Sequence, residues 1–166
     1  MDQPLARDLM TADVVTVEAT TPIRSYVDTI RARRFSGLPV VDGDGKPVGV
    51  VSHTDVLRGL VAFITDGGPL SGDLVTRRRV SSKLMEALMA SVPVPRRIGD
   101  YLDQPVRSIM VGDVISCAPD TPLREACALM TSRHIHRLLV LDGDRIAGIL
   151  SATDVVRHVA GVPRAV

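Results

Sequence analysis

The chain repeats itself at an offset of about one hundred residues, and this duplication constrains its fold more than any other feature. Matching positions follow in the same order in both copies across about fifty residues, which chance does not produce. The matches include Leu9-Met10 with Ile109-Met110, Asp13-Val14-Val15-Thr16 with Asp113-Val114-Ile115-Ser116, Thr21-Pro22 with Thr121-Pro122, Asp42-Gly43-Asp44 with Asp142-Gly143-Asp144, and Gly49-Val50-Val51-Ser52 with Gly148-Ile149-Leu150-Ser151.

Each copy is predicted to run β-α-β-β-α, which makes the fold class mixed α/β (α+β). Thr21 and Thr121 are the expected N-caps of the first helix in each copy, and the proline that follows each is its expected first residue. The second helix is expected to begin near Asp55 or Asp154. One such unit of about sixty residues is marginal alone, so the copies should pack as a pseudo-two-fold pair. The expected strands cover 14–17, 38–41 and 47–51, and 114–117, 138–141 and 146–150.

The stretch between the copies differs in character and divides the chain into three predicted parts. Residues 1–64 form the first unit, 65–100 a helical linker or insert, and 101–166 the second unit. Apolar spacing over 80–89 predicts an amphipathic helix in the insert. The basic cluster within 77–97 either contacts phosphate or a partner, or is a solvated helix face. Its members are Arg77-Arg78-Arg79, Lys83, Arg96 and Arg97.

Composition argues against several classes of protein. A formal net charge of +1 gives no global field that attracts nucleic acid or an anionic membrane. Aromatic residues make up 2% of the chain and Trp is absent, which leaves little for stacking single-stranded bases. The N-terminus shows no signal peptide, and the sequence contains no apolar run long enough to span a bilayer. We therefore expect a cytoplasmic protein for which nucleic-acid binding and membrane association are not indicated.

Motifs of catalysis and metal binding are not found. No phosphate loop, dinucleotide fingerprint or nucleophile-base arrangement is visible, so the chain is not expected to be an enzyme. His134 and His136 alternate along a strand and could form a metal pair. A third ligand with suitable spacing is missing, and Cys117 and Cys127 alone make neither a zinc site nor a disulfide framework. No metal site is predicted.

The duplicated motifs resemble the tandem cystathionine-β-synthase (CBS) domain pair, also called the Bateman module. The resemblance covers both copies, and the ordered, duplicated set of motifs is what makes it specific. It is carried by Met10-Thr11, Val15-Thr16-Val17, Gly37-Leu38-Pro39-Val40-Val41-Asp42 and Gly49-Val50-Val51-Ser52-His53-Thr54-Asp55, and by Ile115-Ser116, His136-Arg137-Leu138-Leu139-Val140 and Gly148-Ile149-Leu150-Ser151-Ala152-Thr153-Asp154.

The resemblance implies clefts that hold an adenosine ligand such as AMP, ADP, ATP or S-adenosylmethionine. In that family an Asp takes the ribose diol, Ser or Thr contacts ribose or phosphate, and short strands contact adenine. Spacing alone favours a helix-capping role for each Ser-x-x-Asp, and the duplication and the family pattern favour binding. Both roles are compatible. The implied site residues are Asp154, Ser151, His136 and Arg137, with Asp55 and Ser52 for the other site. The implied set also includes Thr153, Ile115, Cys117, Thr54, Val15, Thr16 and Gly37.

His136-Arg137 is the sharpest difference between the copies. In the family, basic residues at this strand entry can bind phosphate, and arginine supplies forked donors for it. The first copy carries Ser36-Gly37 there, with Arg33 and Arg34 slightly earlier in the sequence. The second copy is therefore expected to form the more competent site.

The resemblance implies a regulatory module that senses a nucleotide and passes its occupancy to an effector protein, whose identity is unknown. A homodimer is expected, with helices 23–34 and 123–133 as candidate surfaces. The alternative is a structural or dimerisation module whose clefts are vestigial, which Gly37 favours. A nucleic-acid regulator that uses the basic segment 77–97 is a weaker alternative, because the net charge is close to neutral.

Overall fold

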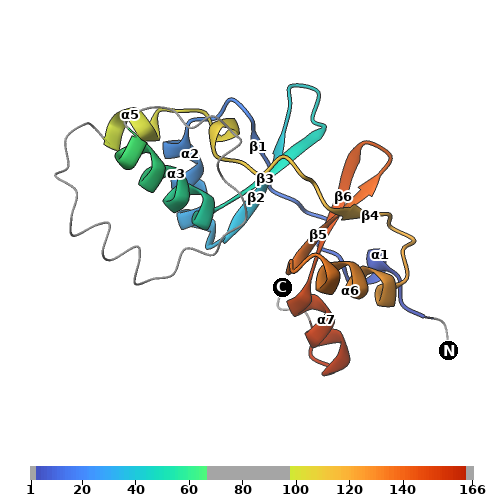
Figure 1. The fold of residues 1–166 in the computed structure, drawn as a ribbon. Coiled ribbons are helices and arrows are strands. Elements are labelled where there is room, and N and C mark those ends of the chain that lie inside the picture. The colour runs from blue at the N-terminus through green and yellow to red at the C-terminus, as the bar shows by residue number, and fades with distance from the viewer. Residues whose placement is uncertain (1–2, 67–97, 164–166) are drawn as a thin grey trace. The chain divides into compact units, whose positions relative to one another are not determined.

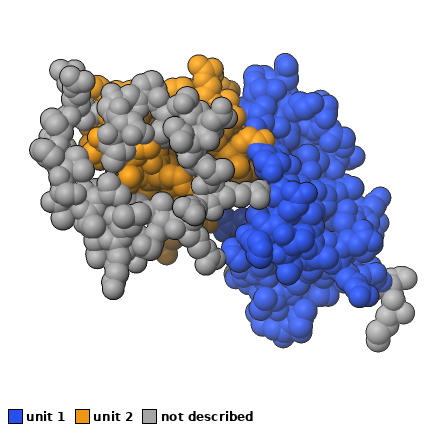
Figure 2. Space-filling view, in the orientation of Figure 1, with its two compact units in different colours: residues 1–16, 41–48, 113–166 blue, residues 17–40, 49–112 orange. Residues whose placement is uncertain are grey.

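The computed structural model describes residues 3–66 and 98–163, and the chain divides into two compact units (Figure 1). Unit 1 consists of Met1–Thr16, Val41–Val48 and Asp113–Val166, and unit 2 of Val17–Val40 and Gly49–Gly112 (Figure 2). The structure contains two three-stranded sheets, with strand orders β1-β2-β3 and β4-β5-β6. The predicted α+β class with two β-α-β-β-α copies is confirmed.

The elements of the first copy follow the predicted order. Its two long strands flank the Asp-Gly turn, and its two helices follow the first and third strands. The Asp-Gly turn differs between the copies because the first has one extra residue. The positive φ falls at Gly45 (78°) in the first copy and at Gly143 (60°) in the second. The elements are β1 (Val17–Glu18), α2 (Ile23–Arg33), β2 (Gly37–Val41), β3 (Pro47–Ser52) and α3 (His53–Asp66).

The second copy repeats this arrangement. β4 pairs with β5 in parallel, and β5 pairs with β6 in an antiparallel ladder. The first strand of each copy is two residues long, shorter than predicted, because the β4–β5 ladder has only the rungs Ser116–Leu139 and Cys117–Val140. The elements are β4 (Ser116–Cys117), α6 (Leu123–Ser132), β5 (Arg137–Asp142), β6 (Arg145–Ser151) and α7 (Ala152–Val159).

The prediction that Thr21 and Thr121 cap the first helices is wrong by one residue. Pro22 and Pro122 are the N-caps, with ψ of 143° and 137°, outside the helical range. Their carbonyls accept the first helical hydrogen bonds, which is what defines the cap position. The Thr121 hydroxyl instead accepts a hydrogen bond from the Ala118 backbone N–H at 3.0 Å. This bond closes the turn in front of α6.

A short leading segment precedes each copy, and it packs on the sheet of the other copy. In unit 1, Thr11 follows α1 (Ala6–Leu9) and bridges to Ile149 of β6. In unit 2, Val111 follows the 3-10 helix η1 (Val106–Ser108) and bridges to Val50 of β3. Each compact unit is therefore completed by residues from both copies of the repeat. The sequence boundaries at 64 and 101 remain a prediction.

A buried glycine lies beneath each leading segment. A Cβ on Gly148 would stand 2.5 Å from Met10 Sδ and 2.9 Å from the Thr11 carbonyl oxygen. A Cβ on Gly49 would stand 2.8 Å from the Val111 carbonyl oxygen and 2.9 Å from Met110 Sδ. The repeated glycine therefore provides the close backbone approach that seats each segment.

The core of unit 1 joins its leading segment to the sheet and to α6. Met130 lies in this core, and most of the other members are aliphatic residues of β5, β6 and the two helices. The cluster comprises Ala6, Leu9, Leu123, Ala126, Met130, Leu138, Val140 and Leu150. α7 contributes no fully buried residue to unit 1.

Unit 2 contains one further helix that the sequence pattern did not predict, α5 (Ile98–Leu102). Tyr101 of α5 and Tyr26 of α2 are fully buried in unit 2. The predicted helix over 80–89 and the basic cluster within 77–97 lie outside the described residues. Among the described helices, none combines the length and hydrophobicity of a membrane-spanning segment.

Candidate functional site

Both Ser-x-x-Asp motifs form reciprocal caps where a strand ends and a helix begins. Asp154 Oδ2 accepts hydrogen bonds from the Ser151 backbone N–H at 2.9 Å and from its hydroxyl at 2.6 Å. The Ser151 Oγ accepts the Asp154 N–H at 3.2 Å. Ser52 and Asp55 repeat the arrangement, at 2.8, 2.6 and 3.4 Å. The capping role is thus present in both copies, and it fixes each carboxylate at the edge of its sheet.

The two carboxylates have different surroundings. Asp55 is 8% exposed, and its Oδ1 accepts a hydrogen bond from Arg58 at 3.3 Å. Burial raises the pKa of Tyr26 and of Tyr101, and the negative charge of Asp55 raises both further. Asp154 is only half-buried. The carboxylate of the second copy is therefore the more accessible of the two.

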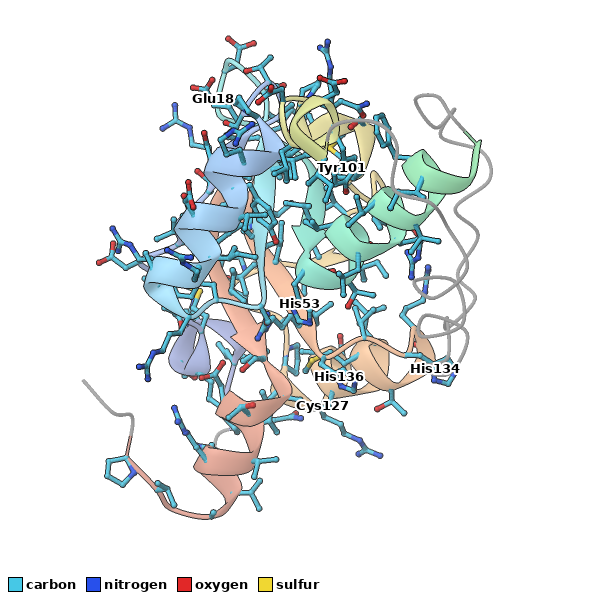
Figure 3. All side chains as sticks on the ribbon, turned by 90° about the vertical axis from the view of Figure 1, so that its left-hand side faces the viewer. Glu18, His53, Tyr101, Cys127, His134 and His136 are labelled. Carbon is cyan, nitrogen blue, oxygen red and sulfur yellow. The ribbon has the colours of Figure 1, made fainter. Side chains whose placement is uncertain are left out.

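A cationic segment lies alongside the second cap. Arg137 at the start of β5 pairs in register with Ser151 at the end of β6. Just beyond this pair, the Ala152 N–H donates a hydrogen bond of 2.9 Å to the His136 carbonyl. Both basic side chains are exposed, and Figure 3 labels His136 at this end of the strand. The structure thus brings His136, Arg137 and the Ser151–Asp154 cap to the same end of one sheet.

Gly37 occupies the corresponding position of the first copy for a steric reason. A Cβ there would lie 2.8 Å from the Val51 carbonyl oxygen and 3.2 Å from Ser52 Cα. The preceding Ser36 carbonyl accepts the His53 backbone N–H at 3.2 Å, and His53 Nδ1 lies 3.0 Å from the same oxygen. Close backbone approach therefore excludes a basic side chain at this position.

The remaining predicted residues fall mainly in unit 1. Thr54 belongs to unit 2 with Gly37, Ser52 and Asp55. Cys117 is half-buried, and burial raises the pKa of its thiol while a hydrogen bond with Thr121 acts in the opposite direction. Unit 1 thus contains the predicted adenine contacts Val15, Thr16, Ile115 and Cys117 together with the second cap, whereas strand β1, which begins at Val17, belongs to unit 2. The predicted site residues of unit 1 are Val15, Thr16, Ile115, Cys117, His136, Arg137, Ser151, Thr153 and Asp154.

One hollow lies beside the second cap, in a place that sequence reasoning did not predict. It has a volume of about 150 Å³ and lies where α1 faces α7 within unit 1. The repeated Leu9-Met10 pair was the sequence signal that could have placed α1 beside this copy. The hollow is lined by Asp8, Leu9, Asp154, Arg157, His158 and Val162. Within residues 3–66 and 98–163, no group of three or more potential ligands could hold a metal ion.

The arrangement of two repeated α+β units, each with a capped strand end, defines a tandem module of CBS type. The family model described as the CBS domain matches residues 6–62 and 106–161, more than half of the chain. The chain belongs to the CBS-domain family and carries the domain twice.

Curated relatives extend along most of the chain. The uncharacterized protein MJ1426 of Methanocaldococcus jannaschii is 28% identical over 156 residues, which cover 92% of this chain and 89% of that protein. The 5'-AMP-activated protein kinase subunit gamma-3 of Sus scrofa is 25% identical over 87% of this chain. The chain spans 23% of that subunit, so the match concerns only that part of the larger protein.

Solved structures share the fold. AcuB from Vibrio cholerae superposes with a TM-score of 0.70 at 21% identity, covering 96% of this chain and 93% of the other. The structure of CBSX2 in complex with AMP superposes with a TM-score of 0.66 at 22% identity, covering 96% of this chain and 98% of the other. The CBS domain pair of MJ0100 with 5'-methylthioadenosine and S-adenosyl-L-methionine gives 0.64 at 19% identity, with the same coverage. At these identities the likeness concerns the fold.

Proposed function

We propose that the chain is a regulatory, non-catalytic module that binds one adenosine nucleotide at the second cap. The observation that carries the proposal is the juxtaposition of Arg137 with Ser151 on adjacent strands, next to Asp154. A carboxylate can accept hydrogen bonds from vicinal hydroxyls, and a guanidinium binds phosphate with two donors. Ribose and phosphate recognition would thus come from one sheet end. Two fold relatives whose structures contain AMP or S-adenosyl-L-methionine support this ligand class.

Each predicted residue has a distinct role in this proposal. Asp154 receives the ribose diol while remaining in its cap, because a carboxylate has more acceptor sites than the cap uses. Arg137 and His136 bind phosphate, and Ser151 and Thr153 contact ribose or phosphate. The strand segments at Val15, Thr16, Ile115 and Cys117 contact adenine. The first copy, with Ser52, Thr54 and Asp55, binds the ligand more weakly, because Gly37 supplies no cation and Asp55 is buried beside Arg58.

Regulation follows from differential binding. A ligand that prefers one conformation shifts the population toward it by its difference in affinity between the states. An effector protein that distinguishes the two conformations then reads nucleotide occupancy. We propose that the chain acts in the cytoplasm as a homodimer through helices 23–34 and 123–133. Sedimentation that shows only monomer at high concentration would contradict the dimer.

The first experiment is a thermal-shift panel with AMP, ADP, ATP, S-adenosylmethionine and GMP. Ligand at a hundred times its Kd stabilises a protein by about 2.7 kcal/mol, which is roughly 5–10 °C for a domain of this size. We expect such a shift with an adenosine ligand and not with GMP. A flat panel, together with no nucleotide released from denatured protein, would favour the structural module with vestigial clefts.

The second experiment tests the ribose contact separately from the cap. Asp154→Asn also weakens the cap, so its unliganded melting temperature is measured first. Wild-type protein is expected to bind AMP more tightly than 2'-deoxy-AMP, and Asp154→Asn is expected to lose this preference. Asp55→Asn is the matched control, because it alters the equivalent cap and should retain the preference. If Asp154→Asn still distinguishes the two ligands, Asp154 does not bind ribose.

A further inference from the structure

The aspartate of the first cap has a charge partner on its own helix. Arg58 lies on α3, three residues after Asp55, and its Nη1 is 3.3 Å from Asp55 Oδ1. The Arg58 side chain is 24% exposed, and Asp55 is buried. Because a partly buried ion pair is screened by salt much less than a surface pair, this contact persists in solution at ordinary ionic strength.

The hydrogen bonds of Asp55 leave little capacity for a further donor. An ionised carboxylate has about four acceptor positions, two on each oxygen. Oδ2 accepts both the backbone N–H and the hydroxyl of Ser52, which fills its two positions. Oδ1 accepts Arg58, so one position of the carboxylate remains. A ribose diol brings two hydroxyl donors, and it therefore needs one acceptor more than this carboxylate offers.

The surroundings of Asp55 favour a cation beside it. Burial raises the pKa of Tyr26 and of Tyr101, and the charge of Asp55 raises both further. Each of these phenols donates its hydrogen bond to a backbone carbonyl, and Figure 3 labels Tyr101. A buried carboxylate is costly unless a cation or hydrogen-bond donors compensate it. Arg58 supplies the compensating charge, because neither phenol donates to the carboxylate.

The second copy carries an arginine at the same helical position, but not the same ion pair. Arg157 on α7 follows Asp154 by three residues, as Arg58 follows Asp55. Within the described parts of the chain, Arg157 forms no ion pair. It lines the hollow beside the second cap together with Asp154. The arginine is thus common to both copies, whereas its contact with the capping aspartate belongs to the first.

We propose that Arg58 is an intramolecular competitor of the ligand at the first cap, and that it limits the chain to one tightly bound nucleotide. This inference rests on the proposed function, in which a capping aspartate receives the ribose diol. The Arg58 guanidinium occupies an acceptor position on Asp55 that the ribose requires. A ligand at the first cap must break this ion pair before it binds, and its affinity falls accordingly.

Adenosine is the probe for this competition, because it carries the diol without a phosphate and so reports on the carboxylate alone. It is titrated calorimetrically into the full-length chain with Asp154→Asn, the substitution expected to remove ribose binding at the second cap. Adding Arg58→Ala should tighten adenosine binding about tenfold, the weight of one hydrogen bond to a charged group. 2'-Deoxyadenosine lacks one of the two hydroxyl donors and should gain much less.

The second copy provides the matched control. Arg157→Ala makes the same substitution at the same helical position, and on the same background it should leave adenosine binding unchanged. Asp55→Asn, added to Arg58→Ala, should remove the gain. Arg58→Ala leaves a buried charge without its partner, so the melting temperature is measured first. If that variant does not fold, Arg58→Met keeps the apolar stem, removes the donors and should show the same gain.

Three results would overturn the proposal. The first is an unchanged affinity for adenosine when Arg58 is replaced, and the second is an equal gain for 2'-deoxyadenosine, which would reflect released space. The third is weaker binding of AMP by Arg58→Ala on the Asp154→Asn background, which would make Arg58 a phosphate ligand. The proposed function fails by a different result. If Asp154→Asn alone leaves AMP binding unchanged, the second cap is not the site, and the comparison at Arg58 still stands.

Discussion

Gly148 lies so close to Met10 that a single added carbon would stand 2.5 Å from the methionine sulfur. The thioether can move, but the Thr11 carbonyl oxygen at 2.9 Å belongs to the backbone that bridges to Ile149. The repeated glycine, 99 positions earlier at Gly49, has the same relation to Met110 and Val111. The seating of each leading segment thus depends on one missing side chain.

We expect Gly148→Ala and Gly49→Ala each to lower the free energy of unfolding by about 1–3 kcal/mol, because a Cβ overpacks the contact. Urea denaturation measures the loss. Gly43→Ala is the control, since a Cβ there meets no atom within 4 Å, and it should change stability by less than about 1 kcal/mol. Wild-type stability in Gly148→Ala would show that the leading segment is not held as described.

The serine caps are expected to contribute to stability equally in the two copies. Ser52→Ala and Ser151→Ala each remove one side-chain acceptor at a helix N-terminus and a donor to an aspartate. Each should cost about 0.5–2 kcal/mol in the free energy of unfolding, measured by urea denaturation. Ser132→Ala, at the exposed C-terminal end of α6, is the comparison and should have a smaller effect. Equal losses in all three variants would contradict the capping role.

The two buried tyrosines predict a loss of stability at alkaline pH. Burial raises the pKa of Tyr26 and Tyr101 above the ordinary value near 10, and the charge of Asp55 adds to this. Above pH 10 the unfolded chain ionises both phenols while the folded chain keeps them neutral. Their contribution is therefore complete below pH 10 and falls by about 1.4 kcal/mol per pH unit for each tyrosine above it.

Urea denaturation between pH 7 and pH 11 measures this decline. Tyr26→Phe and Tyr101→Phe should each reduce the slope above pH 10, although both lower stability at neutral pH by removing the hydrogen bonds to Val51 and Val56. An unchanged slope in both variants would mean that neither phenol is protected in the folded state.

The raised pKa of Cys117 predicts a slow thiol. Burial disfavours the thiolate, which is the form that reacts with alkylating agents. At pH 8 we expect Cys117 to react with iodoacetamide more slowly than the thiol of a free cysteine peptide. Mass spectrometry of digested protein follows the modification, and unfolding in urea should abolish the protection. Reaction at the peptide rate in the folded protein would contradict the burial of this thiol.

Local signals were sufficient for most of the fold. The Asp-Gly turns, the helical spacing and the duplicated strands predicted the order of elements in both copies, because each signal lies within a few residues of the structure it specifies. The Thr-Pro sequence misplaced the cap by one residue, since either residue can precede a first helical turn. The two Ser-x-x-Asp motifs could be recognised in the sequence, because each lies at the point where a strand ends and caps the helix that follows.

The remaining features depend on contacts between distant parts of the chain. The sequence around Met10 does not show that this residue covers Gly148. The sequence suggested that Gly37 replaces a basic residue of the phosphate site, whereas the structure shows that the backbone of Val51 and Ser52 leaves no room for a side chain there. The hollow beside α7 likewise depends on α1, which is about 150 positions away. Periodicity and spacing do not contain such pairings, and the duplication itself was the one sequence signal that pointed to them.

The exchange of leading segments has a consequence for the history of the chain. A single ancestral copy would have had its own leading segment but no foreign sheet on which to lay it. Such a chain could bury the glycine face of its sheet only by pairing with an identical chain, each lending its first residues to the other. Gene duplication would then have joined a pre-existing dimer into one polypeptide. The two halves of the present chain therefore depend on one another, because a cut between them would separate each sheet from the leading segment that covers its glycine.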